Sequence, residues 1–163
     1  MALEPERAMC RIRLRPARPE DVAGIAACVD AAYAPYVERL GRPPGPMLDD
    51  PAAVVAASRV QVATRGGARG ETLVGAVVLE AVDGGSHIRN VAVIPAVKGQ
   101  GVGRRLLEWA EAEARRRGHT SIHLATHQRM TENRALYARI GYAEQAHRRV
   151  DGYPRVLLRK PLA

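Results

Sequence analysis

The stretch from residue 91 to residue 118, VAVIPAVKGQGVGRRLLEWAEAEARRRG, constrains the fold of this chain more than any other. An apolar run typical of a strand ends at Pro95, a glycine-dense turn follows, and the next residues are predicted to form a helix from about Gly103 to Arg117. Three arginines favour the negative C-terminal end of this helix, and Gly118 suits the left-handed position that ends it. The chain therefore contains a strand that passes through a tight turn directly into a helix.

The start of this helix is poorly matched in charge. No Ser, Thr, Asp or Asn precedes it to cap its free N–H groups, while Lys98, Arg104 and Arg105 add positive charge beside an already positive pole. Each mismatch costs only about 0.3–1 kcal/mol on an exposed surface, but all have the same sign. A bound anion would offset the repulsion, and three glycines leave the backbone open to it. The alternative is a tight turn whose arginines are solvated.

Phosphate is the obvious anion, and the known phosphate-binding turns can be compared with this one. The pattern GxxxxGK[ST] is absent, which argues against a nucleotide hydrolase. The dinucleotide fingerprint GxGxxG does not fit either, because the third glycine of GQGVGR comes one place early. In addition, no strand with an acid about 20 residues later follows to hold a ribose.

A third turn of this kind matches better. VAVIPAVKGQGVGRRLL resembles the coenzyme A-binding motif of the GNAT acyltransferase superfamily, Q/R-x-x-G-x-G/A between a strand and a helix. Lys98, Gly101 and Gly103 stand at the three patterned positions, with Lys98 in place of the usual Gln or Arg. The resemblance implies that the main chain of this turn binds the pyrophosphate of acetyl-CoA, in a segment that also includes Gly99, Gln100, Val102 and Arg104.

A second motif supports the resemblance. TENRALYARIGY is similar to the family's N-x-x-x-Y-x-x-x-G-F/Y signature. Asn133 and Tyr137 are one helical turn apart, so both project from the same helix face. The resemblance implies that Asn133 hydrogen-bonds the cofactor and that Tyr137 protonates the departing thiolate. Spacing alone equally allows Tyr137 to be a core aromatic packed with Leu136 and Ile140.

The resemblance also implies direct attack of an amine on the thioester of acetyl-CoA. The backbone N–H groups of Val91, Ala92 and Val93, at the end of the strand, are expected to donate to the thioester oxygen or to the pantetheine amides. No general base is assigned, and a water chain is an acceptable route for the proton. The nearby candidates in the sequence are Glu80, Asp83, His87, His123 and His127.

The acceptor wall is predicted around residues 33–51. Tyr33, Tyr36 and Arg39 are spaced to share one helix face, and Arg39 could hold a substrate carboxylate. The alternative is core packing for the tyrosines and solvent for the arginine. The Pro/Gly-rich segment that follows, GRPPGPMLDDP, is interpreted as a loop at the rim of the active site.

The order of predicted elements gives the fold class. A strand is predicted at Ile12 and Leu14 and a helix after Pro19. Three strand patterns follow at 59–64, 72–85 and 86–95, and then the crossover helix. The chain ends with a strand at 121–127, a short helix at 131–141 and a pair of strands at 143–160. We expect an α/β (α+β) GNAT fold: a central mixed, mostly antiparallel twisted sheet of about six or seven strands with about four helices. Residues 11–163 are assigned to this domain, after an N-terminal extension of residues 1–10.

Composition narrows the function. The chain has 163 residues, 47% of them hydrophobic, which suits one domain. The net charge of +8 predicts attraction to anions, but with one Trp, five Tyr and no Phe there is no visible aromatic platform for nucleic acid. Cys10 and Cys28 are too few for a disulfide framework, and His123 and His127 are poorly spaced for a metal pair, so we expect no metal. No signal peptide or membrane-length segment is visible, and a cytoplasmic location is expected.

The sequence therefore predicts an N-acetyltransferase that moves an acetyl group from acetyl-CoA to a primary amine of a small molecule, amino acid or peptide. A homodimer is compatible with this, and no membrane partner is expected. Two alternatives stay open. One is a GNAT-fold protein that binds acyl-CoA without turnover, and the other is a basic nucleic-acid-binding module.

Overall fold

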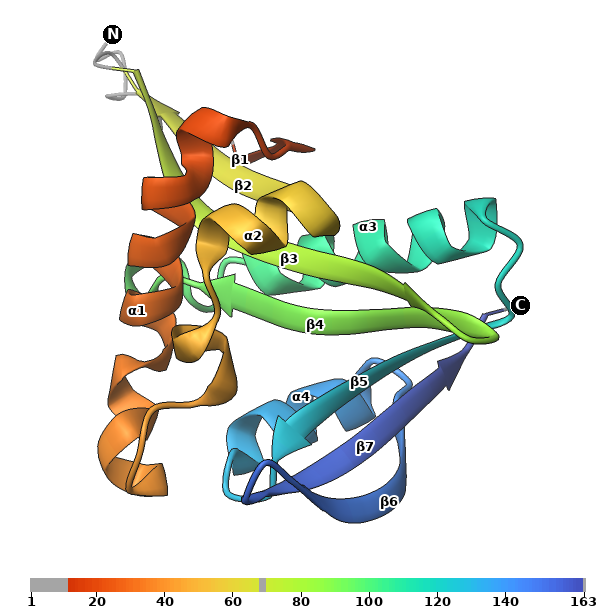
Figure 1. Cartoon of the computed structure of the whole chain (residues 1–163). Helices are drawn as coiled ribbons and strands as arrows, with labels where there is room; N and C mark the ends of the chain where they lie inside the picture. The colour runs from red at the N-terminus through yellow and green to blue at the C-terminus, as the bar shows by residue number, and fades with distance from the viewer. Residues whose placement is uncertain (1–11, 68–69, 163) are drawn as a thin grey trace, which may run out of the picture.

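A seven-stranded sheet forms the middle of the molecule (Figure 1), in a computed structural model that describes residues 12–67 and 70–162. Its strand order is β1-β2-β3-β4-β5-β7-β6, and every neighbouring pair is antiparallel except β4 and β5. The predicted mixed, mostly antiparallel sheet is confirmed. The predicted extension of residues 1–10, with Cys10, lies outside the described residues. The strands are β1 (Ile12–Pro16), β2 (Arg59–Gly67), β3 (Gly70–Val82), β4 (Gly85–Val93), β5 (Ser121–His127), β6 (Ala143–Val150) and β7 (Tyr153–Pro161).

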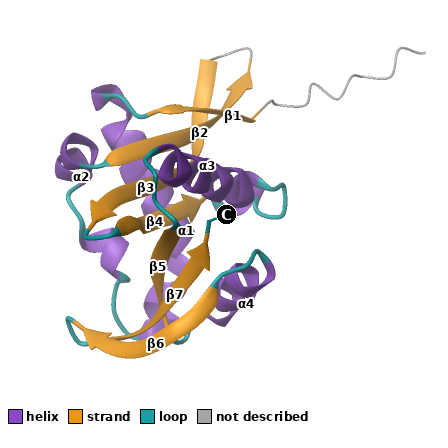
Figure 2. Cartoon of the chain, turned by 90° about the vertical axis from the view of Figure 1, so that its right-hand side faces the viewer, coloured by secondary structure: helices purple, strands orange, loops and turns teal. Residues whose placement is uncertain are grey.

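Four α-helices within the described ranges cover the two faces of the sheet, as expected (Figure 2). They are α1 (Val22–Leu40), α2 (Pro51–Ala57), α3 (Val102–Arg116) and α4 (Thr131–Arg139). One buried cluster joins the sheet to α1 and α2, and a second cluster on the other face joins it to α3 and α4. The site described below lies between these layers, where the sheet itself opens.

The helix α3 matches its sequence prediction closely. It was expected from about Gly103 to Arg117 and runs from Val102 to Arg116. Its apolar stripe is buried against the sheet because apolar residues recur every three or four positions. Gly118 adopts a φ of 80° and its N–H donates to the carbonyl of Arg115 at 2.9 Å, so the predicted glycine end is confirmed.

The Pro/Gly-rich segment 41–51 is more ordered than predicted. It contains a 3-10 turn at Gly45–Leu48, and α2 begins at its last residue, Pro51. Proline fits the first position of a helix, where its missing N–H has no partner to lose. Asp50 caps the same helix by accepting from the Ala52 N–H at 3.1 Å. The prediction of a loop throughout was therefore wrong at both places.

The parallel pair in the centre of the sheet is short. Only three residue pairs join β4 to β5, ending at Ile88 and Leu124. Beyond them β4 pairs with β3 alone and β5 with β7 alone, and Figure 1 shows the two strands diverging. A bulge marks the point of separation, because Leu79 pairs with Ile88 and Val78 with Asn90, which leaves Arg89 out of the ladder. The sheet therefore has a gap at its middle, with one free strand edge on each side.

Candidate active site

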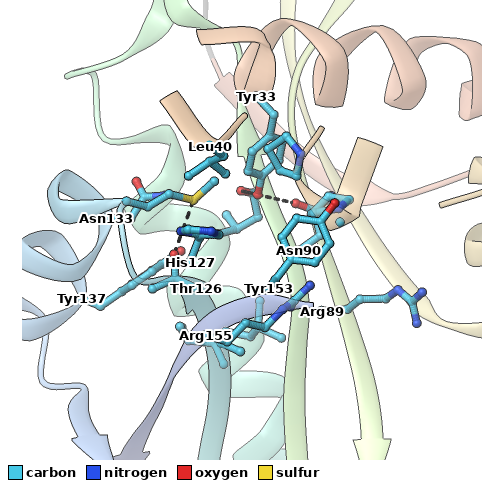
Figure 3. Close-up of a pocket in the computed structure, with 18 residues that line it drawn as sticks. Tyr33, Leu40, Arg89, Asn90, Thr126, His127, Asn133, Tyr137, Tyr153 and Arg155 are labelled. Carbon is cyan, nitrogen blue, oxygen red and sulfur yellow. Dashed lines mark hydrogen bonds between the residues drawn. The ribbon is translucent and has the colours of Figure 1, made fainter. Parts of the chain in front are cut away.

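A pocket of about 50 Å³ lies in the gap between β4 and β5 (Figure 3). It is lined from six segments: the end of α1, the turn at 44–46, β4 from Ile88 to Val91, β5 from Leu124 to His127, the start of α4 and the start of β7. In Figure 3, Asn133 and Tyr137 approach from α4 while Tyr33 and Asn90 lie on the opposite side. Residues far apart in the sequence thus meet where the sheet lacks its own hydrogen bonds.

The free edge of β4 supplies backbone donors to this gap. The Ile94 N–H donates to the Val74 carbonyl at 3.0 Å. In an antiparallel pair successive residues alternate in the direction of their N–H groups, so Ala92 bonds to β3 while Val91 and Val93 point away from it. Of the three predicted donors, Val91 and Val93 therefore face the gap, and the N–H of Ala92 is used within the sheet.

The glycine turn before α3 presents further unpartnered N–H groups. The first helical bond runs from the Arg105 N–H to the Gly101 carbonyl at 3.1 Å, so the N–H groups of Val102, Gly103 and Arg104 have no partner inside the helix. No side chain caps them. Gly101 has a φ of 81°, which a residue with a side chain rarely adopts. This helix start has the features of an anion site.

The neighbouring segment places the turn beside the pocket edge. Gly99 also has a φ of 81°, and the Gln100 N–H donates to the Val97 carbonyl at 3.3 Å. A Cβ built at Gly103 would lie 3.5 Å from the Val93 side chain, so the start of α3 packs on the end of β4. The unpartnered donors of the turn and those of the strand are therefore adjacent parts of one surface.

Only part of the positive charge predicted at the turn faces it. Arg105 donates to the carbonyl of Ile12 in β1 at 2.7 Å. Arg104 pairs with Glu108 one helical turn later at 3.1 Å, and both side chains are largely exposed. Lys98 is exposed and is one of the cations that lower the pKa of Glu132, although Arg39 is the larger cause.

The helix α4 brings Asn133 and Tyr137 together in the pocket, as their spacing predicted. The Asn133 amide contacts Met130 Sδ at 3.7 Å, and the Thr126 hydroxyl contacts the same sulfur at 3.5 Å. The ring of Tyr137 packs edge-on against Tyr142 with centroids 5.8 Å apart. The core interpretation of Tyr137 is thus confirmed for its ring, and the residue also lines the pocket, where its role as the acid stays a prediction.

The Tyr137 hydroxyl is a protonated donor without an acceptor in the part of the chain that the structure describes. It makes no hydrogen bond to any residue in 12–67 or 70–162. Burial raises its pKa above the usual range, because the charged phenolate is disfavoured in an apolar environment. The side chain is only 7% exposed. A buried hydroxyl of this kind is available to a ligand in the pocket.

The predicted acceptor residues on α1 divide into two groups. Tyr33 lines the pocket, and its hydroxyl donates to Asn90 Oδ1 at 2.7 Å. Burial raises its pKa, and the proximity of Tyr137 adds to the effect. Tyr36 is buried outside the pocket, and Arg39 stacks over its ring while pairing with Glu132 at 2.8 Å. The Arg39 guanidinium therefore already has a carboxylate and joins the end of α1 to α4.

His127 is the one candidate base from the sequence that lines the pocket. Its Nδ1 accepts from the Arg129 N–H at 3.0 Å. Burial, with Arg129 and Arg155 nearby, lowers its pKa, so the ring is neutral at pH 7 and carries its proton on Nε2. His127 is then a donor toward the pocket and not a ready base. No Asp or Glu is among the described residues that line it.

Sequence reasoning missed Asn90, Tyr153 and Arg155, which also line the pocket. Asn90 is buried and turned toward α1 by the bulge before it. Tyr153 and Arg155 open β7, and the alternation of Arg155 with buried Val156 was the available signal that the arginine faces the opposite side of the sheet.

Other kinds of site have no support in residues 12–67 and 70–162. No group of three or more His, Cys, Asp or Glu side chains is placed there to hold a metal ion. None of the helices in these ranges combines the length and apolar character needed to cross a membrane. Burial raises the pKa of the Cys28 thiol to about 11, which makes it an inert core residue.

The structure has an opened sheet, an uncapped helix start and a tyrosine-lined pocket. These features agree with the class of protein that the sequence motifs resemble, the GNAT acyltransferases. Residues 25–142 match the family model described as "Acetyltransferase (GNAT) family". The chain belongs to this family, and the resemblance inferred from its motifs is confirmed.

Individual relatives agree with this assignment. Aminoalkylphosphonate N-acetyltransferase of Salmonella typhimurium is 39% identical over 61 residues, covering 37% of this chain and 39% of the relative. The matched region thus spans well under half of that relative's length. The ribosomal-protein-S18-alanine N-acetyltransferase from Escherichia coli has a TM-score of 0.73 and 20% identity, covering 94% of this chain and 95% of that one.

A structure with a bound ligand has the same fold. The PaiA N-acetyltransferase from Thermoplasma acidophilum, in complex with coenzyme A, has a TM-score of 0.73 and 15% identity, covering 93% of this chain and 99% of that chain. At such identities the two structures establish the fold alone. The seven-stranded sheet with four helices is therefore that of other N-acetyltransferases.

Proposed function

We propose that this protein is an N-acetyltransferase that moves an acetyl group from acetyl-CoA to the primary amine of a small molecule, amino acid or peptide by direct attack. The observation that carries the proposal is the meeting of two kinds of donor in one gap. The free N–H groups of Val91 and Val93 lie on one side and the unpartnered hydroxyl of Tyr137 lies on the other. These are the donors that acyl transfer from a thioester requires.

Acetyl-CoA fits the residues around this gap. Its pyrophosphate would take the unpartnered N–H groups at the start of α3, where Gly99 and Gly101 leave the backbone open. Coenzyme A in the Thermoplasma relative supports this proposal. Bound there, acetyl-CoA would supply the activated acetyl group. The residues proposed to hold it are Val91, Val93, Lys98, Gly99, Gln100, Gly101, Val102, Gly103, Arg104 and Asn133.

The chain's own groups can then assist both ends of the reaction. As the amine nitrogen bonds to the carbonyl carbon, that oxygen gains negative charge, and the N–H groups of Val91 and Val93 stabilise it. When the carbon–sulfur bond breaks, Tyr137 gives its proton to the sulfur. Free thiols have a pKa near 8.5 and tyrosines near 10, so this transfer is uphill, and burial of Tyr137 makes it more so.

The fate of the amine proton depends on the groups in the pocket, and the described part of the chain places no carboxylate there. The attacking amine must be neutral, and His127 already carries a proton on its pocket-facing nitrogen. The amine therefore loses its proton to water before or after the attack. The rate should rise with pH up to the pKa of the free amine.

A thiol-release screen tests the proposal. The full chain is mixed with acetyl-CoA and separately with amino acids, alkylamines, polyamines, aminoglycosides and short peptides, and free thiol is measured with a chromogenic disulfide. The N-acetyl product is identified by mass spectrometry. Binding of acetyl-CoA by calorimetry with no thiol release from any amine would support a protein that binds acyl-CoA without turnover, and absence of both would reject the proposal.

A further inference from the structure

The pocket contains two arginines whose environments differ. Arg89 is bound on both sides, to Asp49 at 2.8 and 3.0 Å and to Glu80 at 2.9 Å. Arg155 also lines the pocket, but its guanidinium has no carboxylate or carbonyl partner among the described residues. Figure 3 shows Arg155 rising from β7 beside Tyr153. Since Arg is always charged, Arg155 leaves one uncompensated positive charge in the wall.

His127 adds a second donor beside this charge. His127 of β5 and Arg155 of β7 are directly paired in the sheet, so their side chains lie on the same face and close together. The His127 Nδ1 is occupied by the Arg129 N–H, which leaves Nε2–H for the pocket. The field of Arg155 reaches two groups that line the pocket, because it contributes to the lowered pKa of His127 and opposes the burial that raises the pKa of Tyr33. The two side chains together resemble the donor set that binds a carboxylate or phosphonate.

The turn over the pocket packs against the start of β7. The Tyr153 hydroxyl donates to the Pro43 carbonyl at 2.5 Å, and the Arg42 guanidinium stacks 3.4 Å above the Tyr153 ring. Gly45 then lies directly over Arg155, and a Cβ at position 45 would be 2.7 Å from its Nη2. The glycine thus provides the space that the guanidinium occupies.

From this arrangement we infer that the acceptor is a small amine that also carries an anionic group, a carboxylate or phosphonate, bound by Arg155 and His127. The inference deepens the proposed function and rests on it. Because no Asp or Glu of residues 12–67 and 70–162 lines the pocket, a second ammonium group would find no partner among them and would be repelled by Arg155. Amino acids or aminophosphonates should therefore be preferred over polyamines and aminoglycosides.

Matched acceptors test this preference. β-Alanine, aminoethylphosphonate, propylamine and trimethylenediamine present the same amine on a similar chain and differ in the distal group. We expect kcat/KM for one of the two anionic acceptors to exceed that for propylamine by about 10- to 100-fold, the value of a charged hydrogen bond, with the diamine poorest. The better of the two acids tells which anion the site suits. Equal rates for all four would reject the inference while leaving the proposed acetyl transfer intact.

Variants connect the preference to Arg155. Arg155→Met should reduce the ratio of kcat/KM for the anionic acceptor to kcat/KM for propylamine to near one, and Arg155→Lys should keep part of this ratio. Gly45→Ala should also lower the ratio, by displacing the guanidinium, while Gly66→Ala, where a Cβ meets nothing within 4 Å, should not. An unchanged ratio in Arg155→Met would refute the assignment.

A binding measurement covers the case in which no amine is acetylated. Saturation-transfer NMR detects weak binding of propionate and ethylphosphonate, which carry the anion without the amine. Signal transfer in the parent protein that is lost in Arg155→Met would support the anion site even if the proposed function fails. Transfer that is absent in the parent, or equal in both proteins, would count against it.

Discussion

Replacing Tyr137 by Phe separates the catalytic role of its hydroxyl from the structural role of its ring. The hydroxyl has no hydrogen-bond partner among the described residues, whereas the ring packs against Tyr142 in the core. Phenylalanine keeps the ring and its contacts. The free energy of unfolding should therefore stay within about 0.5 kcal/mol of the parent, which urea denaturation can check.

The expected loss in rate follows from the environment of the hydroxyl. General acids typically contribute about 10²- to 10⁴-fold to a rate, and their effect is greatest when their pKa is close to that of the group they protonate. Burial raises the pKa of Tyr137 further above that of a thiol, so we expect a loss in kcat near the lower end, about 10²-fold. Affinity for acetyl-CoA should not change, because nothing in the phosphate-binding turn is altered.

The assay is steady-state thiol release at saturating acetyl-CoA, with the acceptor found in the screen. Tyr142→Phe is the matched control, because it removes a hydroxyl from the ring that packs against Tyr137. Tyr142 does not line the pocket, so this variant should keep the parent kcat. The raised pKa also predicts no loss of activity up to about pH 10, since Tyr137 keeps its proton until pH exceeds its folded-state pKa. A Tyr137→Phe protein with the parent kcat would refute the assignment of this residue as the acid.

Four further substitutions address the two ends of α3, the histidine and the core. Gly101→Ala and Gly118→Ala place the same strain at the two ends of α3, where φ is 81° and 80°. Each variant should therefore lose about 1 kcal/mol in free energy of unfolding. Only Gly101→Ala should weaken acetyl-CoA binding in calorimetry. His127→Gln keeps a side-chain N–H donor and removes the titration of the ring, so it should abolish any inflection of the parent pH–rate profile that His127 causes, which lies below the usual histidine range because burial lowers this pKa. An inflection that persists in the variant would belong to another group. Leu106→Ala should lower the free energy of unfolding by about 2–5 kcal/mol, because Leu106 is fully buried between α3 and the sheet. A smaller change in urea denaturation would mean that neighbouring side chains collapse into the cavity that the substitution leaves.

The sequence predicted correctly those parts of the fold that depend on interactions between neighbouring residues. The glycine turn, the amphipathic stripe of α3 and the alternating strands depend on short-range sterics and periodicity. The order of the strands in the sheet does not depend on such local rules. Nothing in the sequence of the closing pair at 143–160 indicated that its second strand, β7, would lie between β5 and β6. Its insertion beside β5 is what pairs His127 with Arg155. A long-range pairing of this kind could not be predicted from one sequence.

The candidate site was predictable to the same extent. Asn133 and Tyr137 are four residues apart on one helix, so their common face follows from helix geometry. Asn90 and Ile88 are two apart on a strand, and regular alternation would place them on the same face. The bulge at Arg89 reverses this, because Asn90 contacts Tyr33 on the α1 side while Ile88 packs in the cluster with α3. Bulges have no reliable sequence signal, and this one sets the pocket wall.

Charge was the least predictable property, because an arginine's role depends on its partners. Arg39 was a candidate to hold a substrate carboxylate, with solvent exposure as the alternative, but Glu132 already occupies its guanidinium. Arg105 was expected near the anion, but it donates to Ile12 of β1. The charge mismatch at the start of α3 is thus smaller than the sequence suggests, since Arg105 and Arg104 both have partners of their own.

It follows that affinity for an anion at this turn should depend mainly on the backbone. The N–H groups of Val102 and Gly103 are fixed by the helix and cost nothing to orient, whereas a long exposed side chain loses rotamer freedom when it binds. Lys98 is the one cation of this group with neither an ion pair nor a hydrogen-bond partner for its side chain among the described residues, although it lies close enough to Glu132 to lower that pKa. We therefore expect Arg104→Ala to leave the Kd for acetyl-CoA within about twofold and Lys98→Ala to raise it by up to about fivefold, the scale of one exposed charge. A larger effect from Arg104→Ala in calorimetry would show that the side chain turns from Glu108 to the anion on binding.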